Sequence, residues 1–220
     1  MGACLSVVVV CHNHPNDREA FEGTANMLKD RTVKGIGEVD FCVLLSDAYD
    51  SEEKWLNHLC NVSNKFLLFW YIGHGQDGTM FLKNFTVTAK QLYEKVKDSR
   101  YMSMVLDSCQ NESTYPRPQH CPYRGVEFNS SGGLVDDGIA VSADHGQSML
   151  MVNLMQMVME STCLDRRTVL TTYIALNVKP SADYKNWKHM MHAIIAGVND
   201  TNKFYKQLDH PAMVKMWSLK

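Results

Sequence analysis

The stretch Phe66–Gly75 reads FLLFWYIGHG and indicates the class of fold. It begins with an uninterrupted apolar run, which is typical of a strand buried on both faces of a sheet. We therefore predict a central strand over Lys65–Ile72, followed by a turn that places His74 between two glycines. Because the sites of open parallel sheets lie at the carboxyl ends of their strands, we expect His74 at the functional edge.

A second apolar strand leads to a cysteine. The strand expected over Ser103–Leu106 is followed within three residues by Cys109. A cysteine nucleophile needs a thiolate, an assisting histidine and donors for the oxyanion. We interpret His74 and Cys109 as a catalytic dyad, and the backbone N–H groups of Gly75 and Cys109 as oxyanion donors. Each residue taken alone would fit a turn histidine or a structural thiol better, and it is their joint placement at two strand ends that favours the dyad.

Strands and amphipathic helices alternate along the rest of the chain. Three helix starts are predicted by capping pairs, namely Asn16 with Glu19, Asp50 with Glu53, and Thr88 with Gln91. Further strands are expected at Leu5–Cys11, Val39–Leu45, Gly138–Ser142 and His192–Val198, with a hairpin at Thr79–Phe85 and helices at Met149–Met159 and Arg167–Val178. This order predicts an α/β fold with a mainly parallel sheet of about six strands, covered by helices on both faces.

Composition limits the class and compartment of the protein. The chain has 220 residues, 45% of them apolar, and a formal net charge of −2 with no basic block, so nucleic acid is not an expected partner. Seven cysteines without a CxxC pair favour a reducing compartment, and we expect a cytoplasmic protein. The apolar run Phe66–Ile72 is too short to span a membrane, although Met1–Ser6 matches a weak lipidation pattern.

Three segments resemble one known superfamily. Phe66–Gly75 and Met104–Cys109 are similar to the strand-end motifs of caspases, paracaspases and metacaspases, and Val141–Gln147 resembles the strand-end segment that follows in paracaspases and metacaspases. The resemblance implies a three-layer α/β/α sandwich and a cysteine endopeptidase that acts on protein or peptide substrates in apoptosis or signalling. His74 and Cys109 lie closer in sequence than in caspases, where about 50 residues separate them, so a shortened hairpin and a reduced substrate rim are expected.

The resemblance also implies residues of the substrate pocket. In this superfamily the residue two positions before the catalytic cysteine helps to form the pocket for P1. P1 is the substrate residue after which the chain is cleaved. That residue is Asp107 here, as in members that cleave after Arg or Lys, and Asp144 resembles a second wall of the pocket. A carboxylate there would pair with a basic P1 side chain. Arg18 supports the alternative, an aspartate-specific caspase, but it is also typical of a solvated residue in a first helical turn.

The resemblance divides the single domain 1–220 into a large-subunit-like segment (residues 1–110), a linker loop (residues 111–137) and a small-subunit-like segment (residues 138–220). The linker is rich in proline, serine and glycine, and such exposed segments are where chains are cut. Arg117 precedes a proline, which blocks cleavage, whereas Arg124 precedes Gly125. Arg124 is therefore the self-cleavage candidate, and an enzyme that works as one unbroken chain is the alternative.

Two other classes of function stay open. A caspase fold can act as a decoy or scaffold without proteolysis, although decoys commonly lose the cysteine or the histidine that this chain keeps. The histidines of Cys11–His14 and His189–His192 could serve a metal-dependent hydrolase, but neither has the spacing of a structural zinc site. We expect no metal or cofactor, and calcium activation has no ligand loop to support it. A homodimer through the last strand is possible within the superfamily.

Overall fold

The computed structural model describes residues 5–30, 39–46, 49–61, 66–76, 78–96, 101–109, 138–141, 151–153, 166–177, 196–197, 200–201, 203 and 215–218. Within them a six-stranded sheet has the order β11-β8-β7-β3-β1-β2. All neighbours in this sheet are parallel except β8 and β11. The strands are β1 (Leu5–Cys11), β2 (Val39–Leu45), β3 (Phe66–Ile72), β7 (Tyr101–Asp107), β8 (Gly138–Val141) and β11 (Lys215–Ser218). The predicted mainly parallel sheet is confirmed.

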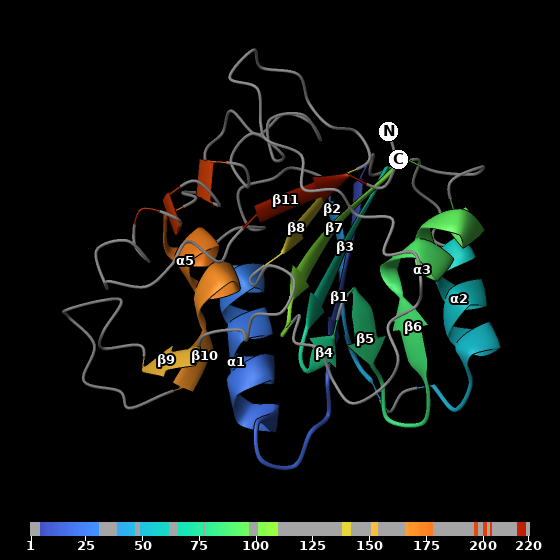
Figure 1. The fold of residues 1–220 in the computed structure, drawn as a ribbon, viewed down its shortest axis with the longest axis horizontal. Helices are drawn as coiled ribbons and strands as arrows, with labels where there is room; N and C mark the ends of the chain where they lie inside the picture. Colours follow the sequence, from blue (N-terminus) through green and yellow to red (C-terminus); the bar gives the residue numbers. More distant parts are fainter. Residues whose placement is uncertain are drawn as a thin grey trace.

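Helices cover both faces of this sheet, as predicted. Helices α1 (Arg18–Leu28) and α5 (Val169–Asn177) pack together on one side, and α2 (Glu52–Cys60) and α3 (Ala89–Val96) pack together on the other (Figure 1). Strand β3 alternates between the two layers, because Phe69 joins the cluster of α2 and α3 whereas Trp70 bonds to α5. Its continuous apolar sequence therefore reflects burial on both sides.

Two small antiparallel sheets complete the described architecture. Strands β4 (Gly75–Gln76), β5 (Thr79–Phe81) and β6 (Thr86–Thr88) form the hairpin region expected after β3. Strands β9 (Met151–Asn153) and β10 (Arg166–Thr168) form the second sheet. None of the helices in the described part of the chain is long and apolar enough to cross a membrane.

Several local predictions need correction. The helix predicted over Met149–Met159 is wrong at Met151–Asn153, because pairing with β10 overrides the helix propensity of methionine there. The strand predicted over His192–Val198 is wrong at residues 196–197, which are helical. A Cβ atom on Gly197 would lie 2.8 Å from Ile174 Cγ1, so this segment packs against α5 instead. The last strand of the sheet is Lys215–Ser218, which is too short to predict from alternation alone.

Helix starts differ in how well their caps were predicted. Thr88 and Gln91 form the expected capping box of α3, since Thr88 Oγ1 accepts from Gln91 N–H at 3.0 Å and Gln91 Oε1 accepts from Thr88 N–H at 2.8 Å. Helix α2 is capped one residue later than predicted, by Ser51. Helix α1 begins after Asp17 rather than Asn16, and among the described residues the Asp17 side chain makes no capping hydrogen bond.

A buried carboxylate joins the sheet to α5. Asp107, at the end of β7, has no exposed surface, and its Oδ2 accepts from Thr168 Oγ1 at 2.5 Å, Thr171 N–H at 3.0 Å and Thr171 Oγ1 at 2.6 Å. Trp70 Nε1 donates to the same Thr171 hydroxyl at 2.8 Å. Asp107 therefore caps the first turn of α5 from a distant part of the chain, where a negative charge is favoured by the helix dipole.

The threonines of α5 give a stability test. Thr171→Val removes a hydrogen bond to the Asp107 carboxylate and leaves Trp70 N–H without its acceptor, so the free energy of unfolding should fall by about 2–4 kcal/mol. Thr172→Val is the matched control, because the buried Thr172 hydroxyl has no hydrogen-bond partner within the described residues. It should be neutral or stabilising by about 1 kcal/mol. Urea unfolding measures both, and equal losses would refute the capping role.

Candidate active site

The carboxyl ends of β1, β3 and β7 stop at one level of the sheet. Cys11 pairs in register with Ile72, and Ile72 with Asp107. The ladder continues one step further, because His12 N–H donates to the Ile72 carbonyl at 2.9 Å and Gly73 N–H to the Asp107 carbonyl at 3.1 Å. His74 and Cys109 each lie two residues beyond the paired ends of neighbouring strands. The structure thus brings the two predicted catalytic residues to one edge of the sheet.

The two glycines around His74 are fixed by close neighbours. A Cβ atom on Gly73 would collide with His12 Cβ and would lie 2.8 Å from the Tyr71 hydroxyl. A Cβ atom on Gly75 would lie 2.6 Å from the Thr79 carbonyl oxygen and 2.9 Å from Ser108 Oγ. The second contact also shows that the turn carrying His74 lies against the residue that precedes Cys109.

The backbone of His74 is held by Tyr71 and the hairpin. The carbonyl oxygen of His74 accepts from Phe81 N–H at 3.2 Å and lies 2.6 Å from the Tyr71 hydroxyl. Burial raises the pKa of Tyr71 well above its usual value, so this hydroxyl stays neutral and able to donate. Two independent contacts therefore fix the direction in which the His74 side chain leaves the turn.

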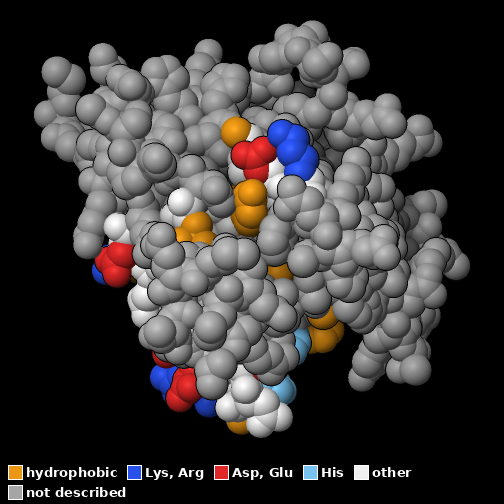
Figure 2. Space-filling view, turned by 90° about the vertical axis from the view of Figure 1, so that its left-hand side faces the viewer, with side chains coloured by type: hydrophobic (Ala, Val, Ile, Leu, Met, Phe, Trp, Pro, Cys, Tyr) orange, Lys and Arg blue, Asp and Glu red, His pale blue; other side chains and the backbone are white. Residues whose placement is uncertain are grey.

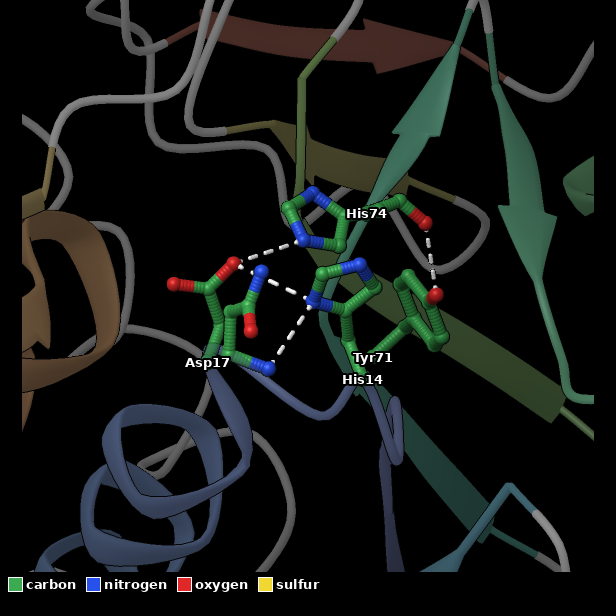
Figure 3. Close-up of polar contacts among 5 residues, drawn as sticks. His14, Asp17, Tyr71 and His74 are labelled. Atoms are coloured by element: carbon green, nitrogen blue, oxygen red, sulfur yellow. Dashed lines mark hydrogen bonds and ion pairs between the residues drawn. The ribbon is translucent and has the colours of Figure 1, made fainter.

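The imidazole of His74 faces a carboxylate that the sequence did not single out. His74 Nε2 lies 2.9 Å from Asp17 Oδ2, and only 10% of the Asp17 side chain is exposed (Figure 3). Asp17 occupies the N-cap position of α1 but turns its carboxylate toward His74. An aspartate at a helix start is normally interpreted as a cap for its own helix, so no sequence signal could have assigned it elsewhere.

Two more histidines surround this pair. His12 and His14 extend from the end of β1, and their ring centroids lie 5.4 Å and 4.6 Å from that of His74. His14 Nδ1 is 3.5 Å from Asp17 Oδ2 (Figure 3). Burial first, and then the neighbouring His74 and His14, lower the pKa of His12 to about 4, so this ring is neutral near pH 7. The cluster therefore gathers three imidazoles around one carboxylate.

The hairpin leaves the Gly75 N–H directed away from its ladder. Gly75 of β4 stands opposite Met80 of β5. The backbone hydrogen bond at this point joins the neighbouring residues, from Phe81 N–H to the His74 carbonyl. Gly75 and Met80 are therefore a pair that exchanges no backbone hydrogen bonds with each other. The Gly75 N–H is thus outside the β4–β5 ladder, as an oxyanion donor requires.

The residues predicted for the P1 pocket are not gathered in the same way. Asp107 is buried beneath the edge and bound to α5. Arg18 is about half exposed and pairs with Glu22 at 2.7 Å on the surface of α1. Figure 2 shows acidic and basic side chains next to one another on this side of the molecule rather than a patch of one sign among the coloured residues. Asp144 and Arg124 lie outside the described residues, so their predicted roles stay predictions.

Comparison with known proteins shows the fold. No protein-family model matches the sequence, and no curated protein matches it. A solved structure, caspase-1 from Spodoptera frugiperda, superposes with a TM-score of 0.60 and covers 99% of this chain and 89% of its own. The chain has a caspase-like fold. At 13% identity this similarity shows the arrangement of helices and strands, and it assigns no activity or residue.

Two cysteines of the fold should differ in reactivity. Cys11 has no exposed surface, and its burial, with a smaller effect from Glu22, raises its pKa to about 12. Because the thiolate is the reactive form, Cys11 should be almost inert near pH 7. Cys109 is partly exposed at the edge of the sheet. Brief iodoacetamide treatment of native protein should label Cys109 and spare Cys11, whereas both should react in urea. Native labelling of Cys11 at the rate of Cys109, measured by peptide mass, would contradict this assignment.

Proposed function

We propose that this protein is a cysteine endopeptidase in which Cys109 is the nucleophile and His74 the acid and base. The observation that supports it is the placement of both residues two positions beyond the in-register ends of β3 and β7, with Gly75 against Ser108 between them. A reactive thiol and an imidazole on adjacent strand ends, beside a backbone N–H outside the hairpin ladder, are the parts that acyl transfer needs.

The proposed reaction proceeds through a thioester. His74 takes the proton of the Cys109 thiol as Sγ attacks the scissile carbonyl carbon, and the oxyanion is bound by the N–H groups of Gly75 and Cys109. His74 then gives a proton to the leaving amine as the C–N bond breaks. Water, deprotonated by His74, attacks the thioester and releases the acid and the free thiol. Because Nε2 of His74 is turned to Asp17, Nδ1 is the ring nitrogen that serves Cys109.

Asp17 is proposed as the residue that positions His74. Its carboxylate is 2.9 Å from Nε2, largely buried, and fixed at the start of α1. Such a partner holds the imidazole in one tautomer and stabilises the imidazolium that forms during the reaction. This role supplies the third member that the sequence could not identify.

We propose that the enzyme prefers Arg or Lys at P1 because Asp107 carries a negative charge near the nucleophile. The carboxylate has no exposed surface but lies two residues from Cys109, and a charge in a region of low effective dielectric attracts a basic side chain without direct contact. The alternative is that Asp107 only caps α5 and takes no part in substrate recognition.

The nucleophile has a direct test. Cys109→Ala and His74→Ala should each lower kcat/KM for fluorogenic peptides by at least about 10³-fold, because both groups act in bond breaking. A panel that differs only at P1 identifies the working substrate, and circular dichroism confirms that the variants keep the fold. Cys42→Ala is the matched cysteine control. Retention of peptide hydrolysis by Cys109→Ala within a few-fold of the parent would overturn the proposal.

The role of Asp17 can be separated from a structural one. Asp17→Asn should lower kcat by about 10- to 100-fold and leave KM within about twofold, because orientation of His74 affects the chemical step rather than substrate binding. Asp50→Asn is the matched control, an exposed aspartate at the start of α2. A variant that raises KM with unchanged kcat, or that only lowers stability, would exclude the positioning role.

Capping and recognition by Asp107 give different results. If its charge selects P1, Asp107→Asn should lower the preference for arginine over its neutral isostere citrulline by at least about tenfold. Thr171→Val disturbs the same cap but keeps the charge, so it should leave that preference unchanged. An unchanged preference in Asp107→Asn would restrict Asp107 to stability. If the parent enzyme prefers aspartate at P1, Arg18 replaces Asp107 as the candidate residue of the P1 pocket.

A further inference from the structure

Three side chains at the edge of the sheet bring metal-ligating atoms together. His14, Asp17 and His74 each offer one ligand atom, and all three atoms lie within 4.8 Å of one another. We propose that these residues form a site for a divalent transition-metal ion of the Zn²⁺ class, and that the bound ion inhibits the enzyme by occupying His74. The inhibitory consequence rests on the proposed function, whereas the binding of the ion does not.

The separations fit a tetrahedral centre. Ligand atoms at about 2.0–2.1 Å from Zn²⁺ lie about 3.3 Å from each other. Asp17 Oδ2 is 2.9 Å from His74 Nε2 and 3.5 Å from His14 Nδ1, so two edges of the tetrahedron are already within about 0.5 Å of that value. The third edge, between the ligand atoms of His14 and His74, is no longer than 4.8 Å, so the ion has to draw these two rings together by at most about 1.5 Å.

The donor set matches the chemistry of this class of ion. Two imidazole nitrogens and one carboxylate oxygen suit zinc and its neighbours, while calcium and magnesium prefer oxygen donors alone. Asp17 supplies a negative charge, and the ion takes the place of the proton between His74 Nε2 and Asp17 Oδ2, which moves to Nδ1 of the same neutral ring. The long contact from Asn16 N–H to His14 Nδ1, at 3.4 Å, is also given up.

Solvent reaches the proposed centre. The exposed fractions of the His14 and His74 side chains are 37% and 31%. A water molecule can therefore complete the fourth position, and the ion can enter and leave. A site with three protein ligands and one open position differs from the closed four-ligand sites of structural zinc.

An ion on Nε2 would stop the proposed chemistry without touching Cys109. A neutral imidazole bound through Nε2 carries its proton on Nδ1, so it has no lone pair with which to deprotonate water. The ion also takes the Asp17 carboxylate that would stabilise the imidazolium. Inhibition should therefore be reversible by a chelator, and it should depend on His14, which has no part in the proposed reaction.

The binding test uses Co²⁺ as a spectroscopic probe in Cys109→Ser protein, where thiolate ligation at the nucleophile is impossible. Tetrahedral d–d absorption should appear on titration. His14→Gln in this background should weaken Co²⁺ binding by more than about tenfold, since even partners outside the ligand shell contribute about 10- to 100-fold. His58→Gln, the same change at an exposed histidine of α2, should bind as the background does. Asp17→Asn gives a second ligand variant, and thermal melts without metal check folding.

The result that overturns the site is equal Co²⁺ affinity in His14→Gln and His58→Gln. The site is also overturned if the parent binds Co²⁺ with a thiolate charge-transfer band and Cys109→Ser does not bind it, because the ion would then sit on Cys109.

Activity separates this inference from the proposed function. For parent, His14→Gln and His58→Gln, the hydrolysis rate with Zn²⁺ is divided by the rate of the same protein without it. The inhibitory Zn²⁺ concentration should rise more than about tenfold in His14→Gln alone, and a chelator should restore the parent. Co²⁺ binding that depends on His14 in a chain that cleaves no peptide would reject the protease and keep the site. An active parent whose Zn²⁺ response ignores His14 would reject the inhibitory site and keep the protease.

Discussion

In-register parallel pairing of β1, β3 and β7 sets the position of every residue at the carboxyl edge of the sheet. Cys11, Ile72 and Asp107 stand side by side, so the chain leaves all three strands at the same level. A shift of one residue in β3 would exchange its two faces, moving Phe69 and Trp70 into the wrong layers. The hydrophobic core therefore fixes the register, and the register brings His74 and Cys109 to the same edge.

Two buried carboxylates show how the site is tied to the layer of α1 and α5. Asp107 caps α5, while Asp17 stands at the start of α1 and turns to His74. Burial of a carboxylate is costly unless hydrogen bonds compensate, and each finds its partners in a segment remote in sequence. Asp107 connects the strand before Cys109 to residues beyond the predicted linker, so the two predicted subunit-like segments share this bond.

Much of the fold was predictable because its signals are local. The apolar run of β3, the capping box of Thr88 and Gln91, and the glycines around His74 are each contained in a few residues. The errors arose where pairing across the chain outweighs local preference. Met151–Asn153 is a strand only because β10 lies beside it, and the side chain of the N-cap residue Asp17 contacts His74 instead of capping α1.

The class of fold and the positions of His74 and Cys109 at strand ends follow from the sequence alone, because buried parallel strands and the turns that end them have short, recognisable patterns. The surroundings of those residues depend on the tertiary structure. The nearness of Asp17 and His14 to His74, and of Asp107 to Thr171, follows from the packing of helices against the sheet. No local pattern encodes such contacts, since they depend on where distant segments meet after the core has formed.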